Sequence, residues 1–130
     1  QHPRFFSVTF LACRALLERA IRGDLNVCLA PQILFEFFAV VTNPSRVTKP
    51  IILTEALDEM KKLIDSLPFI APPVNVHESV INLMRQLGFG SKHIFDVVVA
   101  ATMLGNGVAQ LYTYDIERFQ KIPGIRVLNP

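Results

Sequence analysis

The sequence lacks the side chains on which several common chemistries depend. It has no tryptophan, only two cysteines and only three histidines among 130 residues. Cys13 and Cys28 are too few for a disulfide scaffold or a zinc knuckle, and both suit the reduced interior of a cytoplasmic protein. The histidines lie in no recognisable motif with a serine or cysteine nucleophile. The sequence therefore gives no support to acyl transfer or to zinc chemistry.

The motifs of nucleotide cofactors and membrane spans are missing as well. The chain contains neither a Walker loop nor a G-x-G-x-x-G fingerprint, and its Gly105-Asn106-Gly107 run is better explained as the end of a helix. No uninterrupted apolar run approaches the roughly 20 residues that a membrane helix needs. We therefore expect neither a nucleotide cofactor nor a membrane span.

What the chain does have is the size and composition of one apolar domain. Its length fits a single domain covering residues 1–130. Hydrophobic residues make up 51% of the chain, which is high for a monomer and predicts contact with another protein. The net charge of +2 permits contact with nucleic acid but does not argue strongly for it.

Hydrophobic periodicity predicts an alternation of helices and strands along the chain. The predicted helices cover residues 3–21, 31–43, 54–65, 76–87 and 94–104, and the predicted strands cover 26–29, 69–70, 108–113 and 125–128. Such alternation is typical of an α/β domain with a mostly parallel sheet and right-handed crossovers.

Three acidic residues stand out because they lie in apolar surroundings or directly after a strand. Asp96 is the only charge between Lys92 and Asp115, and Glu36 is the only charge in its predicted helix. Ligands bind at the carboxyl ends of the strands in open α/β sheets, where Glu36, Asp96 and Asp115 are all expected. Carboxylates that meet there repel one another unless a cation lies between them. Carboxylate oxygens favour a hard divalent cation.

Each acid also has a purely structural explanation. Glu36 falls on one helical stripe with Gln32, which is typical of a narrow solvent-facing surface. Asp96 in the first turn of a helix is favoured by the helix dipole, and Asp115 suits the N-cap position before Ile116. On the residues alone, these explanations stay open beside a shared site.

The order of several short segments resembles a PIN domain, and in detail the VapC-type toxins of bacterial toxin–antitoxin pairs. The segments are 31–36 (PQILFE), 94–101 (IFDVVVAA) and 112–115 (YTYD), followed by Phe119, Pro123 and Gly124. The resemblance covers essentially the whole chain. It implies a three-layer α/β/α fold whose parallel sheet carries, at its carboxyl edge, three or four acids that hold Mg²⁺ or Mn²⁺ and cut RNA. It matches Glu36, Asp96 and Asp115 to the second, third and fourth of these acids, all metal ligands, and Thr113 to the hydroxyl residue of the strand-end motif.

The sequence departs from this pattern in two places. The family's first strand lies in the middle of the sheet and ends in the first catalytic aspartate, and no counterpart is recognisable after Gln1. We therefore expect the central first strand to be missing from this chain, which would be an N-terminally incomplete PIN-like domain. In addition, Arg118 stands where many relatives carry a further acid.

The resemblance implies a cytoplasmic, Mg²⁺- or Mn²⁺-dependent endoribonuclease, the toxin of a type II pair, that forms a homodimer and binds a cognate antitoxin. Arg46, Lys49, Arg118 and Lys121 are candidate phosphate contacts, although each also fits an ordinary surface cation. The alternative is a catalytically inactive PIN-like interaction domain that dimerises and binds a protein or RNA without turnover. A phospho-acceptor domain ranks last because the opening acidic pair that it needs is absent.

Overall fold

Strands and helices alternate along the chain, as the periodicity predicts. A computed structural model describes residues 6–8, 14–113 and 115–129. The elements are β1 (Phe6–Val8), α1 (Arg14–Ile21), β2 (Val27–Cys28), α2 (Pro31–Val41), α3 (Leu53–Ser66), α4 (Val76–Leu87), a 3₁₀ turn η1 (Ser91–His93), α5 (Ile94–Gly105), β3 (Gln110–Tyr112), α6 (Ile116–Phe119) and β4 (Arg126–Leu128).

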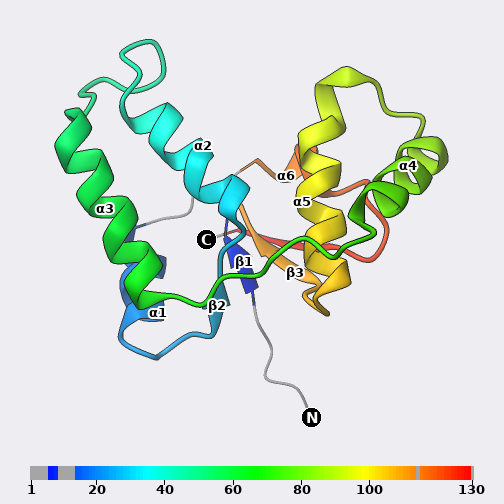
Figure 1. Cartoon of the computed structure of the whole chain (residues 1–130), viewed down its shortest axis with the longest axis horizontal. Helices are drawn as coiled ribbons and strands as arrows, with labels where there is room; N and C mark the ends of the chain where they lie inside the picture. The colour runs from blue at the N-terminus through cyan, green and yellow to red at the C-terminus, as the bar shows by residue number, and fades with distance from the viewer. Residues whose placement is uncertain (1–5, 9–13, 114, 130) are drawn as a thin grey trace.

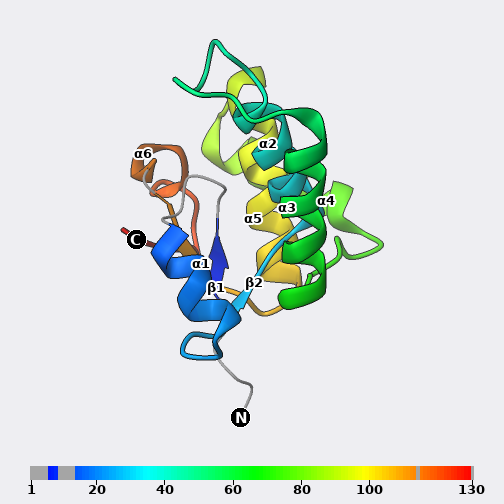
Figure 2. The ribbon, with the colours of Figure 1, turned by 90° about the vertical axis from the view of Figure 1, so that its left-hand side faces the viewer.

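The four strands form one parallel sheet in the order β2-β1-β3-β4 (Figure 1). Figure 2 shows α1 and α6 on one side of this sheet and α3 and α5 on the other. Helices on both faces are expected of a parallel sheet, because its crossover connections place them there. The predicted three-layer α/β/α PIN-like fold with a parallel sheet is therefore confirmed.

The prediction that the central strand is missing from this chain is wrong. β1 fills the central position, with Phe6 paired to Val27 on one side and to Gln110 on the other. The predicted helix over residues 3–21 is consequently wrong in its first part, and the helix α1 begins at Arg14. Phe6 and Phe10 have helical spacing, but the backbone groups of a segment between two strands pair on both sides, and this pairing outweighs local spacing.

The second half of the chain follows the predicted boundaries closely. The helix α4 covers the predicted residues and ends at Gly88, whose φ of 65° is the left-handed conformation that glycine adopts readily. The helix α5 ends at Gly105, and Gly107 has a φ of 72° before the chain enters β3. The strand expected at residues 69–70 is reduced to one parallel bridge between Leu29 and Phe69.

Two helices pack their apolar residues on the sheet, and this packing sets the place of the candidate site. Ile33 and Leu34 of α2 are buried in one core cluster with Ala100 and Met103 of α5 and with Leu111 of β3. The first turns of both helices therefore lie beside the carboxyl ends of the strands. Gln32 joins the two helices, because its Nε2 donates a hydrogen bond of 3.2 Å to the carbonyl oxygen of Phe95.

The described residues include one of the two cysteines, Cys28. Burial raises the pKa of the Cys28 thiol to about 11, so that this side chain is a neutral core residue at pH 7. Within residues 6–8, 14–113 and 115–129, no helix combines the length and the apolar character required to cross a membrane.

We predict that Ser7→Pro unfolds the domain at moderate temperature, whereas Ser7→Ala does not. Proline removes a backbone N–H donor from a strand with neighbours on both sides, which costs about 3 kcal/mol or more. Thermal unfolding of both variants, followed by circular dichroism, checks this expectation. Equal melting temperatures for the two variants would contradict the central position of β1.

Candidate functional site

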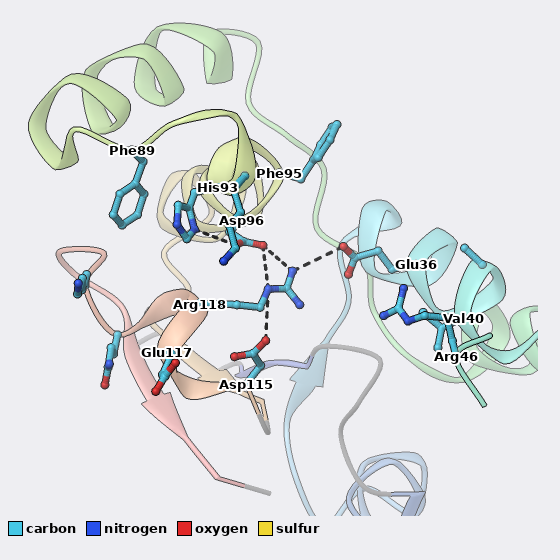
Figure 3. A pocket seen from close by; sticks show the side chains of 14 residues that line it. Glu36, Val40, Arg46, Phe89, His93, Phe95, Asp96, Asp115, Glu117 and Arg118 are labelled. Atoms are coloured by element: carbon cyan, nitrogen blue, oxygen red, sulfur yellow. Dashed lines mark hydrogen bonds and ion pairs between the residues drawn. The ribbon is translucent and has the colours of Figure 1, made fainter. Parts of the chain in front are cut away.

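The three acids identified in the sequence come from three separate elements and converge on one side chain, Arg118 (Figure 3). Glu36 lies in α2, Asp96 in the first turn of α5, and Asp115 in the connection between β3 and α6. Arg118 belongs to α6 and lies between them. The structure therefore brings these three acids together around one side chain at the sheet edge, and the cation between them belongs to the protein itself.

The contact between Arg118 and Asp96 is the tightest in the site. Both Nε and Nη2 of Arg118 donate hydrogen bonds to Oδ1 of Asp96, at 3.1 and 2.5 Å. Asp96 is only 5% exposed, so its carboxylate has little water to replace these donors. Hydrogen bonds between two ionised groups are stronger than neutral ones, which makes this pair the anchor of the cluster.

The contacts of Arg118 with the other two acids are longer. Nη2 lies 3.8 Å from Oε1 of Glu36, and Nε lies 3.9 Å from Oδ2 of Asp115. The side chains of Glu36 and Asp115 are 33% and 44% exposed, so water screens both interactions. One guanidinium thus faces three carboxylates, of which only Asp96 is buried and directly hydrogen-bonded.

The short helix α6 and the turn before it fix the position of Arg118. Phe119, its neighbour, is fully buried in the core, and the guanidinium carbon of Arg118 lies 5.2 Å from the centre of the Phe119 ring. The backbone N–H of Asp115 donates a hydrogen bond of 3.0 Å to Oγ1 of the buried Thr113. Thr113 therefore shapes the turn that carries Asp115, and among the described residues it is not one of those that line the cavity.

Burial and charge shift the pKa of two members of the cluster. Burial raises the pKa of the Glu36 carboxyl above its ordinary value, while the positive charge of Arg118 opposes this rise and the negative charge of Asp96 adds to it. Burial by itself would lower the pKa of Arg118, yet the hydrogen bond and charge of Asp96, with the other two carboxylates, raise it. Arg118 therefore stays charged, and burial disfavours the ionised form of Glu36.

His93 occupies the far side of Asp96. Its Nδ1 lies 3.7 Å from Oδ2 of Asp96 and has no hydrogen-bond partner among the described residues. Its ring lies on Phe89, with 4.4 Å between the ring centres. The two oxygens of Asp96 thus face different neighbours, Arg118 on one side and His93 on the other.

The cluster opens into a cavity of about 1090 Å³. Besides the three acids, its lining includes the cations Arg46, Lys92 and Lys121. The sequence-based set of phosphate contacts had Arg46 and Lys121 but missed Lys92, which lies four residues before Asp96. Lys49, which was in that set, is not among the described residues that line the cavity.

The structural alternatives for the three acids account for little of this geometry. Asp115 is the residue before α6, but its side chain makes no capping hydrogen bond and faces Arg118 instead. Glu36 lines the cavity and does not lie on a fully solvated stripe, whereas its neighbour Phe35 is 62% exposed. Asp96 does lie in the first turn of its helix, where the dipole favours it in addition to Arg118.

Three carboxylates at one point are the donor set that Mg²⁺ and Mn²⁺ prefer, so the chemistry of Glu36, Asp96 and Asp115 fits a divalent cation. Their present spacing suits the guanidinium instead. Within the part of the chain that the structure describes, no three acidic, histidine or cysteine side chains are placed to share one metal ion. The resemblance implies a further acid at the end of the first strand. The strand β1 contains no acid and does not supply this carboxylate.

Solved structures of toxin–antitoxin complexes share this fold. DNA-bound VapBC from Salmonella typhimurium matches over 98% of both chains with a TM-score of 0.69 and 16% identity. A toxin–antitoxin complex from Klebsiella pneumoniae and VapBC-1 from nontypeable Haemophilus influenzae match over 96% of this chain and 97% of theirs, each with a TM-score of 0.62, at 14% and 12% identity. No protein-family model and no curated protein matches the sequence. These likenesses confirm the VapC type of PIN-like fold.

We predict that Asp96→Ala lowers the free energy of unfolding by about 1–3 kcal/mol, because it removes two hydrogen bonds to a charged donor. The matched truncation Glu36→Ala should cost less or be neutral. The folded-state pKa of Glu36 is raised, so ionised Glu36 opposes folding above that pKa, and alanine removes this unfavourable term. Urea unfolding at pH 7 without divalent metal measures both. A larger loss for Glu36→Ala than for Asp96→Ala would contradict the described order of contacts.

Proposed function

We propose that this protein is the ribonuclease toxin of a type II toxin–antitoxin pair and that it hydrolyses RNA phosphodiester bonds with Mg²⁺ or Mn²⁺. The observation that carries the proposal is the convergence of Glu36, Asp96 and Asp115, from three elements, on one cationic group at the carboxyl edge of the sheet. Bringing carboxylates together at such an edge costs free energy, because the charges repel one another and lose water. Such a cost is more readily explained by a functional site than by a contribution to the stability of the fold.

In this proposal the three acids hold the metal, and the rest of the site keeps them in place. A bound divalent cation lowers the pKa of a water molecule and neutralises charge on the leaving oxygen. Asp96, held at the start of the buried helix α5, would be the fixed ligand, while Glu36 of α2 and Asp115 of the β3–α6 connection would complete the set. Thr113 contributes through its hydrogen bond to the backbone of Asp115, as a positioning residue.

The cavity provides for an anionic substrate. Arg46, Lys92 and Lys121 line it together with Arg118, the three acids and Glu117, so that positive side chains share the cavity with the acidic centre. Lysine and arginine side chains bind backbone phosphates without reading the base sequence. This arrangement supports a polynucleotide substrate better than a small neutral one.

We further propose a cognate antitoxin and a second copy of this chain as partners of a cytoplasmic toxin. Support comes from large apolar side chains at the surface of α2, α3 and the residue before α3, where Phe35, Ile52 and Leu53 are 62%, 64% and 59% exposed. Exposed apolar residues in such number are typical of a protein that binds another protein. The similar solved structures are described as toxin–antitoxin complexes.

The second candidate is a PIN-like interaction domain that binds a partner without turnover. One observation favours it: Arg118 already forms ion pairs with all three acids, and β1 supplies no further carboxylate. A protein of this kind would neither bind Mn²⁺ specifically nor cleave RNA, which separates it from the proposed nuclease.

We predict that Asp96→Asn lowers Mg²⁺-dependent RNA cleavage by about 100-fold or more, because it removes a charged ligand of the catalytic centre. Asp58→Asn is the matched control, since Asp58 is exposed on α3 and outside the cavity lining. The assay is cleavage of a labelled RNA pool by the full chain, with chelator as the blank. Undiminished cleavage by Asp96→Asn would remove Asp96 from the mechanism, and no cleavage by the unaltered protein would favour the interaction domain.

A further inference from the structure

The position of Arg118 has consequences beyond the proposed nuclease activity. Among the described residues, no other lysine or arginine forms an ion pair with Glu36, Asp96 or Asp115. Arg118 pairs with all three, and its two hydrogen bonds go to one oxygen of the most buried acid. The strongest acceptor in the candidate metal site is therefore already in use.

We propose that Arg118 is a built-in competitor of the divalent metal, so that the site is closed by its own guanidinium until a metal ion displaces it. The inference rests on the proposed function and concerns how the same site is regulated. It assigns to Arg118 an inhibitory role, in contrast to the role in phosphate binding that its charge alone suggests.

Competition follows from the chemistry of the shared oxygen. Oδ1 of Asp96 accepts from both Nε and Nη2, and a hard cation needs lone pairs of the same carboxylate. A guanidinium and a divalent ion that both approach the buried carboxylate of Asp96 also repel each other. The two cations therefore compete for the carboxylate of Asp96, and metal affinity is lowered by the free energy that holds Arg118 in place.

Displacement of the guanidinium requires only a movement of its side chain. The backbone of α6 is anchored by Phe119, which is fully buried, and by Ile122, which is 2% exposed just beyond the helix. The Arg118 side chain is 30% exposed and lies in the wall of the cavity, so it has space into which it can turn. The same fold can thus hold either the closed or the metal-bound arrangement without rearranging its core.

The phosphate groups of RNA offer Arg118 a new partner once it leaves Asp96. Guanidinium groups bind phosphate oxygens in a bidentate manner, and the cavity into which Arg118 faces is the one lined by Arg46, Lys92 and Lys121. Metal and polynucleotide should therefore assist each other, because the metal takes the carboxylates and the phosphate takes the released arginine. Bound RNA should thereby raise the affinity of the site for the metal. Without RNA, Arg118 stays paired with Asp96.

The test is Mn²⁺ binding by the full chain, measured without RNA from the electron paramagnetic resonance signal of free Mn²⁺. Arg118→Gln should bind Mn²⁺ at least about tenfold more tightly than the unaltered protein, because two hydrogen bonds to Asp96 no longer oppose the metal. Lys121→Gln removes one positive charge from the same cavity without touching an acid, and Arg85→Gln removes one from the exposed face of α4. Both controls should change the affinity by less than about threefold.

A second variant covers the case in which Arg118→Gln does not fold, as judged by circular dichroism. Arg118→Lys keeps the charge but loses the fork of donors that grips Asp96, and it should also tighten Mn²⁺ binding, by a smaller factor. Equal affinities for the unaltered protein and both Arg118 variants would overturn the inference and leave the proposed nuclease intact. Absence of Mn²⁺ binding in all variants would overturn the metal-dependent function and the inference together.

Discussion

The structure depends on the attraction between the single guanidinium of Arg118 and the carboxylates of Glu36, Asp96 and Asp115. These acids arrive from different parts of the chain, and their mutual repulsion would push α2, α5 and the β3–α6 connection apart if no cation lay between them. The guanidinium supplies that cation, with the buried Asp96 as its main partner. The packing of the core sets the positions of the helices. The ion pairs of Arg118 then hold α2, α5 and α6 together at the edge of the sheet.

The same attraction explains why one arrangement is compatible with two functions. A cation is required at this point of the fold, but the requirement does not specify which one. With Arg118 in place the protein is a PIN-like domain whose buried carboxylate is already paired and whose surface exposes apolar side chains, which suits an interaction module. With a divalent metal in place of the guanidinium, the same carboxylates suit a nuclease. The two candidate functions therefore differ in which cation, Arg118 or a divalent metal ion, is bound to Asp96 under cellular conditions.

The sequence was most informative where the local signal and the tertiary structure agree. The all-apolar α5 with a single carboxylate in its first turn, the glycine-rich end of that helix, and the acid after β3 were all predictable from residue type and spacing. The first strand was not, because Phe6 and Phe10 satisfy a helical period and only pairing with β2 and β3 decides between the two structures. Three residues are too short a segment for periodicity to identify.

The contact between Arg118 and the three acids could also not be predicted from the sequence, although two features of the sequence pointed toward it. Arg118 stands where the resemblance implies a further acid, and it lies three residues after Asp115, a spacing that brings two side chains together on a helix. Neither signal indicates that Asp96, 22 residues earlier, is its main partner, since that contact depends on how α5 and α6 pack. The role of Thr113 could not be predicted from the sequence either, because the hydrogen bond that its Oγ1 accepts from the N–H of Asp115 depends on the geometry of the turn.

The most direct test of the account is the nuclear magnetic resonance signal of the Arg118 Nε–H group, titrated with Mg²⁺. In metal-free protein we expect this proton to exchange slowly with water and to resonate away from the other arginines, because it donates to a buried carboxylate. On saturation with Mg²⁺, the signal should move to the position and the fast exchange of a solvated arginine. A signal that is already solvated without metal, or one that Mg²⁺ leaves unchanged, would contradict the claim that Arg118 and the metal compete for one site.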